Sequence, residues 1–271
     1  IHRWAKHSQT YCFKYKKMSL RILDMISVIM AVHRYDKYVD ISIDSILNQT
    51  YSDFELIIIA NGGDCFEIAK QLKHYTELDN RVKIYTLEIG QLSFALNYAV
   101  TKCKYSIIAR MDSDDVSLPL RLEKQYMYML QNDLEMVGTG IRLINENGEF
   151  IKELKYPNHN KINKILPFKN CFAHPTLMFK KDVILKQRGY CGGFNSEDYD
   201  LWLRILNECP NIRWDNLSEC LLNYRIHNKS TQKSALAYYE CASYSLREFL
   251  KKRTITNFLS CLYHFCKALI K

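Results

Sequence analysis

Between residues 26 and 131, short apolar runs alternate with segments of helical periodicity, and this alternation constrains the fold more than any other feature. Uninterrupted apolar runs are typical of strands that are buried on both faces of a sheet. Repeated strand–helix–strand units place their strands in parallel, with helices covering both faces. We therefore predict a largely parallel α/β sheet, with strands at 26–32, 54–60, 82–87 and 105–111 and helices near 39–47, 65–77, 92–103 and 119–131.

The alternation ends after residue 135. Apolar segments at 136–144 and 150–154, separated by Asn147-Gly148, predict a β-hairpin. Further on, 173–179 is apolar but irregular, 189–195 is rich in glycine, a helix begins near Ser196, and 221–227 reads as a last strand. Within the earlier helix at 65–77, the spacing predicts that Phe66, Ala69 and Leu72 face the core.

Polar side chains follow three of the predicted strands where those strands end. Arg34 follows the first strand, Asn61 the second, and the segment from Asp112 to Asp115 the fourth. The carboxyl edge of an open α/β sheet is where ligands bind, so we expect these residues to contribute to one site.

Three carboxylates lie together in the last of these segments, on Asp112, Asp114 and Asp115. Carboxylate oxygens are good ligands for Mg²⁺ or Mn²⁺, and these ions in turn bind phosphates. Aspartate and serine also begin turns and cap helices, and Pro119 suits the first position of a helix. The residues alone leave both interpretations open.

A second acidic pair, Glu197 and Asp198, lies in the first turn of the helix that begins near Ser196. Acids are enriched there because they interact favourably with the helix dipole, so a purely structural role is one explanation. Catalysis is the other. A general base has to reach its substrate, and a flexible glycine-rich loop directly before the pair favours that interpretation.

Composition limits the class of protein. The 271 residues are 48% hydrophobic and 25% charged, which suits one large domain or a domain with an appendage and excludes a disordered chain. The net charge of +9 favours anionic partners such as nucleic acid, anionic lipid or a phosphate-bearing substrate. Ten cysteines without a Cys-x-x-Cys pair predict reduced thiols in a cytosolic protein. We expect no signal peptide, and no apolar run approaches the ~20 residues of a membrane span.

Both ends of the chain are basic. In residues 1–25, lysines and arginines precede the first acid, Asp24, and predict either a poorly ordered extension or a basic arm for a membrane or nucleic acid. Residues 235–271 predict a basic amphipathic helical tail. Its apolar stripe consists of Phe258, Leu262, Phe265 and Leu269. Such a tail lies in a membrane interface or packs on the domain, and the pattern alone does not separate the two.

Several longer stretches carry a resemblance to a known family. They include Ala-Arg-Met-Asp-Ser-Asp-Asp at 109–115, Glu-Asp-Tyr-Asp-Leu-Trp at 197–202, and the segments 26–32, 45–59, 95–97 and 174–176. From residue 26 to about 227 the chain resembles a family 2 glycosyltransferase of the GT-A fold, of the bacterial type that builds cell-surface polysaccharide. The resemblance implies a glycosyltransferase domain at 26–234, with a nucleotide-sugar-binding half at 26–135 and an acceptor and catalytic half at 136–234.

The resemblance also implies roles for the residues of both acidic clusters. Asp112 fills the place near the ribose of the nucleotide, Asp114 the place of the metal ligand, and Asp115 supports them. Asp198 fills the place of the catalytic base, with Glu197 as its neighbour. The other residues implied in nucleotide-sugar binding are Val32, Arg34, Asn61, Ser113 and Arg225, and His227 is implied as a metal ligand.

Two positions depart from the family pattern. Asn61 stands where members usually carry Asp, and Ala31 stands where they usually carry Pro. The amide of Asn61 can still hydrogen-bond the edge of a uracil, but the change puts base identity and affinity in question.

The implied reaction is an inverting, single-displacement transfer from a nucleotide-diphosphate sugar, preferably a UDP-sugar, with Mn²⁺ or Mg²⁺ as cofactor. The implied acceptor is a glycan or a polyprenyl-phosphate-linked sugar. The protein is expected to be cytoplasmic, peripheral on the anionic inner face of the cytoplasmic membrane, with no nucleic-acid partner. A sugar nucleotidyltransferase is one alternative, but it would be expected to carry a glycine-rich loop where residues 31–36 contain no glycine. A non-catalytic nucleotide-sugar-binding protein is the other, and it gives no reason for both acidic clusters to be intact.

Overall fold

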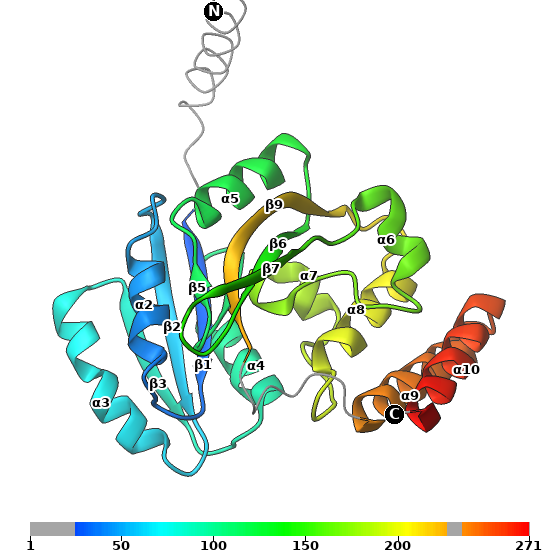
Figure 1. Cartoon of the computed structure of the whole chain (residues 1–271), viewed down its shortest axis with the longest axis horizontal. Coiled ribbons are helices and arrows are strands. Elements are labelled where there is room, and N and C mark those ends of the chain that lie inside the picture. Colours follow the sequence, from blue (N-terminus) through cyan, green and yellow to red (C-terminus); the bar gives the residue numbers. More distant parts are fainter. Residues whose placement is uncertain (1–24, 227–234, 271) are drawn as a thin grey trace, which may run out of the picture.

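The computed structural model describes residues 25–226 and 235–270, and its strands form one curled, mostly parallel sheet flanked by helices (Figure 1). The strand order is β3-β2-β1-β4-β8-β6-β9-β5, and β7 pairs with β6 outside this path. The strands are β1 (Ile26–Val32), β2 (Phe54–Asn61), β3 (Val82–Leu87), β4 (Ile107–Asp112), β5 (Val116–Ser117), β6 (Met136–Ile144), β7 (Phe150–Leu154), β8 (Met178–Lys180) and β9 (Trp214–Arg225). The helices are α2 (Val39–Leu47), α3 (Cys65–Leu78), α4 (Leu92–Lys102), α5 (Arg121–Gln131), α6 (His159–Ile165), the 3₁₀ turn η1 (His174–Thr176), α7 (Lys181–Lys186), α8 (Glu197–Glu208), α9 (Ala235–Lys252) and α10 (Ile255–Ile270).

The first half of the chain forms the parallel part of the sheet. β1 pairs in parallel with both β2 and β4, and β2 pairs in parallel with β3. Successive side chains of a strand point to opposite faces, so they enter two cores. Val28 and Met30 of β1 join one core with α2 and α3, whereas Ile29 joins the other core with α4. The strands and helices predicted for this half are confirmed, with ends that differ by at most two residues.

The sheet continues into the second half of the chain through β8, which runs antiparallel beside β4. β6 is antiparallel to β8 and parallel to β9, and β7 returns along β6 as the Asn147-Gly148 turn predicts. Of the strand predicted at 221–227, residues 221–225 form the last part of the longer β9, and residue 227 lies outside the described part of the chain. The sequence did not predict β8, α6 or α7, because each is too short for its periodicity to show.

One predicted core contact is wrong. Phe66 is 64% exposed. α3 buries Leu72, as predicted, together with Cys65, Ile68 and Tyr75. These four side chains recur at the spacing of one helix face, and each residue turns the helix by about 100°, which carries Phe66 away from that face.

The topology brings the predicted polar segments to one edge. β1 lies between β2 and β4, so the order of the parallel strands reverses at β1. In open α/β sheets, ligands bind in the crevice outside the carboxyl ends of the strands at such a point. β1 ends at Val32, β2 at Asn61 and β4 at Asp112, and all three ends lie at this edge.

α9 and α10 form a helical hairpin that packs against α8 and the loop after α6 (Figure 1). The tail therefore packs on the domain, as one of its two interpretations predicts. Among the described helices, none combines the length and the apolar character needed to cross a membrane. Residues 1–24, 227–234 and 271 lie outside the described part of the chain, and with them the predicted basic extension.

Candidate active site

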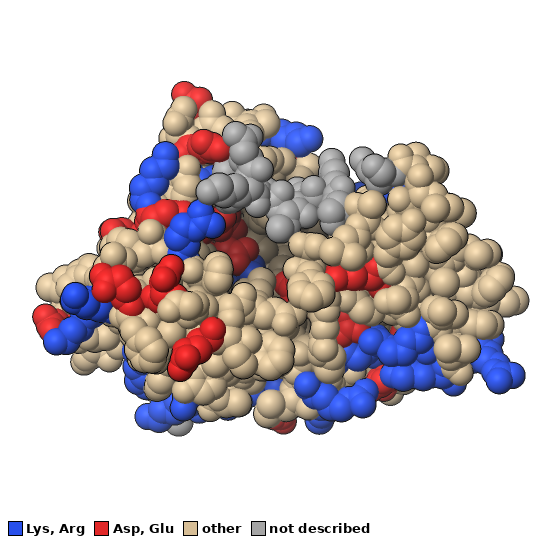
Figure 2. Space-filling model, turned by 90° about the horizontal axis from the view of Figure 1, so that it is seen from below, with Lys and Arg blue, Asp and Glu red and all other residues tan. Residues whose placement is uncertain are grey.

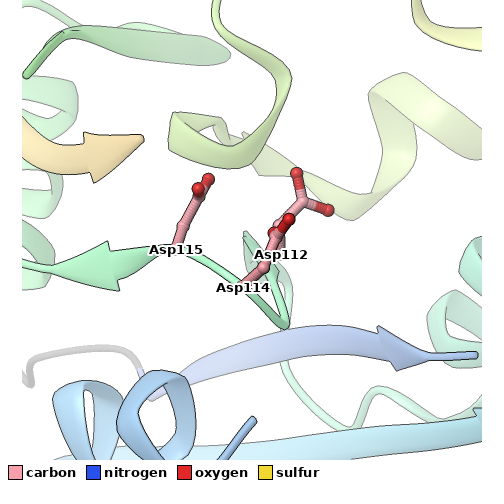
Figure 3. A group of neighbouring side chains, drawn as sticks. All are labelled: Asp112, Asp114 and Asp115. Atoms are coloured by element: carbon pink, nitrogen blue, oxygen red, sulfur yellow. The ribbon is translucent and has the colours of Figure 1, made fainter. Parts of the chain in front are cut away.

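The three aspartates after β4 converge. Ligand oxygens of Asp112, Asp114 and Asp115 lie within 4.8 Å of one another, and the side chains project to the same side of the turn (Figure 3). Asp115 is buried, and its Oδ2 has no hydrogen-bond partner among the described residues. Burial and the charges of the other two aspartates raise the pKa of Asp115 well above its ordinary value. A positive ion would offset this charge, so the donor set fits a hard divalent cation such as Mn²⁺ or Mg²⁺.

Two buried arginines support this turn. Arg110, on β4, forms a two-pronged ion pair with Asp112, in which Nη1 lies 2.5 Å from Oδ2. Arg121, at the start of α5, donates from Nη2 to the carbonyl of Arg110 at 2.5 Å. Burial lowers the pKa of Arg121 to about 9, although the negative charge of Asp115 acts in the opposite direction. Arg121 is thus protonated at neutral pH and provides a positive charge near the aspartates.

Arg225, at the end of β9, ties the turn to neighbouring elements. Its backbone N–H donates to Asp115 Oδ1 at 2.8 Å, and its Nε donates to the carbonyl of Asp114 at 2.9 Å. Its Nη1 donates to the carbonyls of Asn145 and Glu146. These contacts describe a residue that positions the aspartate turn, and a direct contact of Arg225 with a diphosphate stays a prediction.

The acidic pair lies at the N-terminus of α8. Asp198 accepts hydrogen bonds from Nδ2 of Asn170 at 2.8 Å and from the backbone N–H of Tyr199 at 2.7 Å. Burial raises the pKa of Asp198, although these two hydrogen bonds lower it. The pair and the aspartate turn belong to one electrostatic site, because the charges of Asp114 and Asp198 both add to the effect of burial in raising the pKa of Asp112.

Glu197 has a different environment from its neighbour. It is 8% exposed, and burial together with the charge of Asp198 raises its pKa to about 8. Its Oε1 lies 3.7 Å from Nδ1 of His174, whose own pKa is lowered well below the ordinary value by burial and by Arg110. At neutral pH this contact joins a neutral imidazole to a protonated carboxyl. Two adjacent carboxyls with such different partners can take different roles in acid–base chemistry.

The glycine-rich loop before α8 is fastened at its first residues. Asn97 of α4 donates from Nδ2 to the carbonyl of Tyr190 and accepts the Tyr190 N–H with Oδ1, both at 2.8 Å. At Gly189, φ is +75°, and a Cβ would lie 2.3 Å from Oδ1 of Asn97. Both the backbone conformation and the space therefore require glycine there.

The other end of this loop is fastened to α9. Glu240 accepts the backbone N–H groups of Phe194 at 2.8 Å and Asn195 at 3.3 Å, and the hydroxyl of Ser196 at 2.5 Å. The hydroxyl of Tyr244 lies 3.4 Å from the same serine oxygen. The loop that the sequence suggested to be flexible is thus held by α4 on one side and by the helical hairpin on the other.

Val32 and Asn61 end β1 and β2. The Val32 side chain is fully buried in the core, so a contact with a nucleotide would come from its backbone. Asn61 is 2% exposed, and its carbonyl oxygen lies 3.1 Å from Nδ1 of His33. The side-chain Oδ1 of Asn61 is buried without a hydrogen-bond partner among the described residues.

The remaining predicted residues lie on loops. Arg34 is exposed after β1, and Ser113 is half-buried between the aspartates. His227 lies outside the described residues, so its predicted role as a metal ligand stays a prediction.

Comparison with known proteins decides the family. A model of the family described as "Glycosyl transferase family 2" matches residues 27–188. The chain belongs to glycosyltransferase family 2. This family 2 glycosyltransferase is 33% identical over 227 residues to the uncharacterized glycosyltransferase MJ1057 of Methanocaldococcus jannaschii, a match that covers 81% of this chain and 77% of the relative.

Two further relatives carry more specific names. The amylovoran biosynthesis glycosyltransferase AmsE of Erwinia amylovora is 30% identical, with 77% of this chain and 79% of the relative covered. The UDP-Gal:alpha-D-GlcNAc-diphosphoundecaprenol beta-1,3-galactosyltransferase of Escherichia coli is 30% identical, with 76% of each chain covered. Family 2 glycosyltransferases similar to this chain therefore include proteins of polysaccharide biosynthesis.

The fold agrees with a solved structure. The crystal structure of S. aureus TarS 1–349 in complex with UDP-GlcNAc matches this family 2 glycosyltransferase with a TM-score of 0.66 at 15% identity, covering 91% of this chain and 73% of TarS. At this identity the likeness shows the fold alone, and it confirms the GT-A fold that the sequence resemblance implied.

Sequence analysis of this family 2 glycosyltransferase missed several residues that shape its site. Arg110 and Arg121 are fully buried arginines, and a charged residue inside an apolar strand is a signal that points to Arg110. Asn170 and Glu240 carry no such local signal. They reach Asp198 of α8 and Ser196 directly before it from 28 and 44 residues away in the chain, and only the folded structure reveals these contacts.

Proposed function

We propose that this enzyme transfers a sugar from a UDP-sugar to a glycan or lipid-linked acceptor with inversion at the anomeric carbon. The observation that carries the proposal is that Asp198 and the turn with Asp112, Asp114 and Asp115 are close enough to interact electrostatically. The turn supplies a donor set for a cation that binds a diphosphate, and Asp198 supplies a carboxylate whose pKa is raised towards that of a useful base. We further propose that residues 26–135 hold the donor and residues 136–234 hold the acceptor.

The orphaned oxygen of Asn61 supports a uracil-containing donor. A buried acceptor without a partner is costly, and the N3–H of uracil is a donor that would satisfy Oδ1. In this proposal Asp112 contacts the ribose, while Arg34, Ser113 and the backbone of Val32 complete the nucleotide-sugar contacts. The UDP-sugars named for the E. coli relative and for the TarS complex point to the same nucleotide.

Asp198 is the proposed general base. It takes the proton of the acceptor hydroxyl while that oxygen forms a bond to the anomeric carbon. The bond from this carbon to the diphosphate oxygen breaks, and UDP leaves with the electron pair. Attack from the face opposite UDP inverts the configuration, so no covalent enzyme intermediate forms. Asn170 and the N–H of Tyr199 hold the carboxylate in a fixed orientation for this transfer.

The turn that carries Asp112, Asp114 and Asp115 is proposed to hold the cation that offsets the negative charge of the leaving group. Asp114 is the proposed metal ligand, supported by Asp115, and His227 is a proposed further ligand. When Mn²⁺ or Mg²⁺ is bound there, it supplies positive charge for the departing diphosphate. Arg225 keeps the turn in place through the carbonyl of Asp114 and adds its own positive charge to the region.

The acceptor is proposed by analogy with the relatives. The E. coli relative is named for a diphosphoundecaprenol-linked acceptor, and AmsE is named for amylovoran biosynthesis. We propose a polyprenyl-phosphate-linked sugar as acceptor, at the cytoplasmic face of the membrane, in the synthesis of a cell-surface polysaccharide.

Nucleotide release from a panel of UDP-, GDP- and dTDP-sugars tests the proposal. With Mn²⁺ we expect release from at least one UDP-sugar, loss of release in excess chelator, and recovery when Mn²⁺ is restored. Asp114→Asn should lower the rate by ~10²-fold or more, because it removes a carboxylate that holds the metal, and with the metal the positive charge that stabilises the departing diphosphate. The matched control is Asp53→Asn, at an exposed loop position before β2, which should keep the wild-type rate. Undiminished release in chelator, or from Asp114→Asn, would rule out the metal role. Turnover of only GDP- or dTDP-sugars would rule out UDP.

A further inference from the structure

α10 packs with its apolar side turned away from the protein. The side chains that it buries are Asn257, Ser260, His264 and Ala268. The large apolar side chains that it exposes by at least 45% are Ile255, Phe258, Leu259, Leu262, Phe265, Leu269 and Ile270. Helices of globular domains normally bury their apolar side, so the orientation of α10 is the reverse of the usual one.

α9 shows the same reversal. It buries Ala242, Ser245 and Glu248, and its exposed apolar side chains are Leu236, Tyr239, Leu246 and Leu250. Of the 21 large apolar side chains that are exposed among the described residues, eleven lie on these two helices. This concentration marks an interaction surface, because single exposed apolar residues are normal but contiguous groups of them are not.

Specific polar contacts fix the reversed orientation. Nε2 of His264 lies 2.9 Å from the hydroxyl of Tyr199 on α8, and Nδ2 of Asn257 donates to Oδ1 of Asn207 at 3.1 Å. Nη1 of Arg247 forms an ion pair with buried Asp200 at 2.5 Å. The polar side of the hairpin is therefore the side that belongs to the protein.

The apolar stripes of the two helices form one surface. The rings of Tyr239 and Phe265 are in contact near one end of the hairpin, with centroids 5.9 Å apart. Those of Phe249 and Phe258 are in contact near the other end, at 5.4 Å. We call the eleven exposed apolar side chains of α9 and α10 the hairpin face. Seen from below, the region of α9 and α10 presents a mostly uncharged surface with Lys and Arg gathered along one edge (Figure 2).

The charges of the hairpin select the kind of partner. Its two carboxylates, Glu240 and Glu248, both face the protein: Glu240 binds the loop before α8, and the side chain of Glu248 is 1% exposed. Lys251, Lys252 and Arg253 lie at the turn between the helices. Lys251 pairs with Glu208 and Glu248, Lys252 donates to the carbonyl of Asn207, and Arg253 is exposed. A second copy of this chain would bring the same cations to the contact without a carboxylate on the hairpin face to pair them. A lipid bilayer with anionic headgroups would cover the exposed apolar side chains and attract the positive charge of the hairpin.

We propose that the hairpin face docks the enzyme onto the surface of an anionic lipid bilayer. The helices lie in the interface without spanning it, with the polar side held by α8. Glu240 connects this surface to the loop that leads into Glu197 and Asp198. Docking thus places the catalytic end of α8 beside the membrane, where a lipid-linked acceptor would lie; this last step rests on the function proposed above.

Vesicle co-sedimentation of the full-length protein tests the docking surface. The test variant is Leu262→Glu/Leu269→Glu, because both side chains are exposed and neither belongs to the ring contacts that join the helices. The matched control is Phe66→Glu/Leu78→Glu, which changes two exposed apolar residues of α3. Vesicles are phosphatidylglycerol with phosphatidylcholine in equal amounts, or phosphatidylcholine alone. UDP release in the absence of vesicles is measured in parallel on all proteins.

We expect wild type and the α3 control to pellet with the anionic vesicles and to pellet less with the neutral ones. At high salt their binding to anionic vesicles should weaken but remain measurable. The hairpin variant should lose at least about tenfold in vesicle partitioning, since two carboxylates then oppose both insertion and the anionic surface, while its UDP release stays normal. Equal pelleting of both variants, or no preference for anionic vesicles, would overturn the proposal. A wild-type dimer in light scattering that the hairpin variant abolishes, without vesicle binding, would assign the face to a second copy. Vesicle binding without UDP release from any protein would sink the proposed function and leave the docking surface standing.

Discussion

At the scale of single residues, adjacent carboxyls differ because their surroundings differ. Asp198 accepts two hydrogen bonds that favour its ionised form, whereas Glu197 is buried beside that charge and next to a neutral imidazole. We propose that Asp198, oriented by these hydrogen bonds, acts as the base, and that Glu197, whose pKa is raised to about 8, is a neutral hydrogen-bond donor.

Kinetics of Asp198→Asn and Glu197→Gln test this division of roles. Asp198→Asn should lower transfer by ~10²-fold or more with near-normal donor binding, because it removes the base without removing a donor contact. Glu197→Gln should stay within about threefold of wild type at neutral pH, since the amide mimics a protonated carboxyl. If Asp198 only favours the helix start, its amide variant should cost about 1 kcal/mol or less in stability and keep its rate. Equal losses in donor binding and turnover would also count against the base.

The pH dependence of unfolding reports on Glu197 separately. Its pKa is about 8 in the folded protein against 4.5 for the ordinary side chain, so the folded state holds the proton more tightly. The stability contribution of Glu197 is therefore fully present below its ordinary pKa and is lost as the pH rises through about 8. We expect the unfolding temperature of wild type to fall relative to that of Glu197→Gln between about pH 5 and pH 9. A constant difference across this range would show that burial does not raise the pKa.

At the scale of elements, α9 reaches the active site through one carboxylate. Glu240 accepts hydrogen bonds from Phe194, Asn195 and Ser196, the three residues directly before α8. These contacts set where the helix begins, and with it the position of Asp198. Glu240 is thus a positioning residue that acts through the loop.

We expect Glu240→Gln to lower kcat by about tenfold to a hundredfold with little change in KM for the donor, since a small displacement of the base costs rate more than binding. Glu240→Asp should recover part of the loss, because the shorter side chain keeps the charge. Glu219→Gln is a suitable control, as it also removes a surface carboxylate, in this case one paired with Lys124 on an exposed face. A loss confined to stability, with kcat unchanged, would reduce Glu240 to a structural contact.

The elements also show where sequence reasoning succeeds and where it ends. Long apolar runs such as β1 and β2 are predicted well because their signal is local and both faces are covered. β8 has three residues and owes its place to β4 and β6, which lie far away in the chain. For α10 the periodicity identifies the apolar side correctly, but the side that packs is decided by partners such as Tyr199. The positions of the aspartates follow from strand β4, whereas the support from Asn170 and Glu240 is a property of the folded chain.

At the scale of the whole molecule, the tail is part of the domain and not an addition to it. Its polar side meets α8 through the ion pair of Arg247 with Asp200 and through His264 and Asn257. Removal of the tail would therefore disturb both the domain and the loop before α8.

Truncation after Ser234 should lower the unfolding temperature by at least about 4 °C. The lost contacts exceed two net hydrogen bonds, or about 2 kcal/mol, and each kcal/mol shifts a domain of this size by about 2–4 °C. Transfer should fall as well, because the loop loses Glu240. Thermal unfolding of the truncated protein beside Leu262→Glu/Leu269→Glu separates the two sides of the hairpin, since the double variant alters only exposed positions and should unfold near the wild-type temperature. Unchanged stability after truncation would mean that the polar contacts of the hairpin contribute nothing.

The reversed hairpin also inverts the pattern of mutational tolerance along α9 and α10. In most helices, replacing leucine or phenylalanine by a polar residue reduces expression, whereas serine and alanine positions accept many replacements. Here the hydroxyl oxygens of Ser245 and Ser260 form a buried hydrogen bond of 2.8 Å, and Ala268 is 4% exposed. A library that replaces each residue of the hairpin should thus find the small residues intolerant and the large apolar ones permissive for soluble yield. For the same reason, purified wild type should adsorb to surfaces and to detergent micelles more readily than variants with polar residues at Leu262 and Leu269.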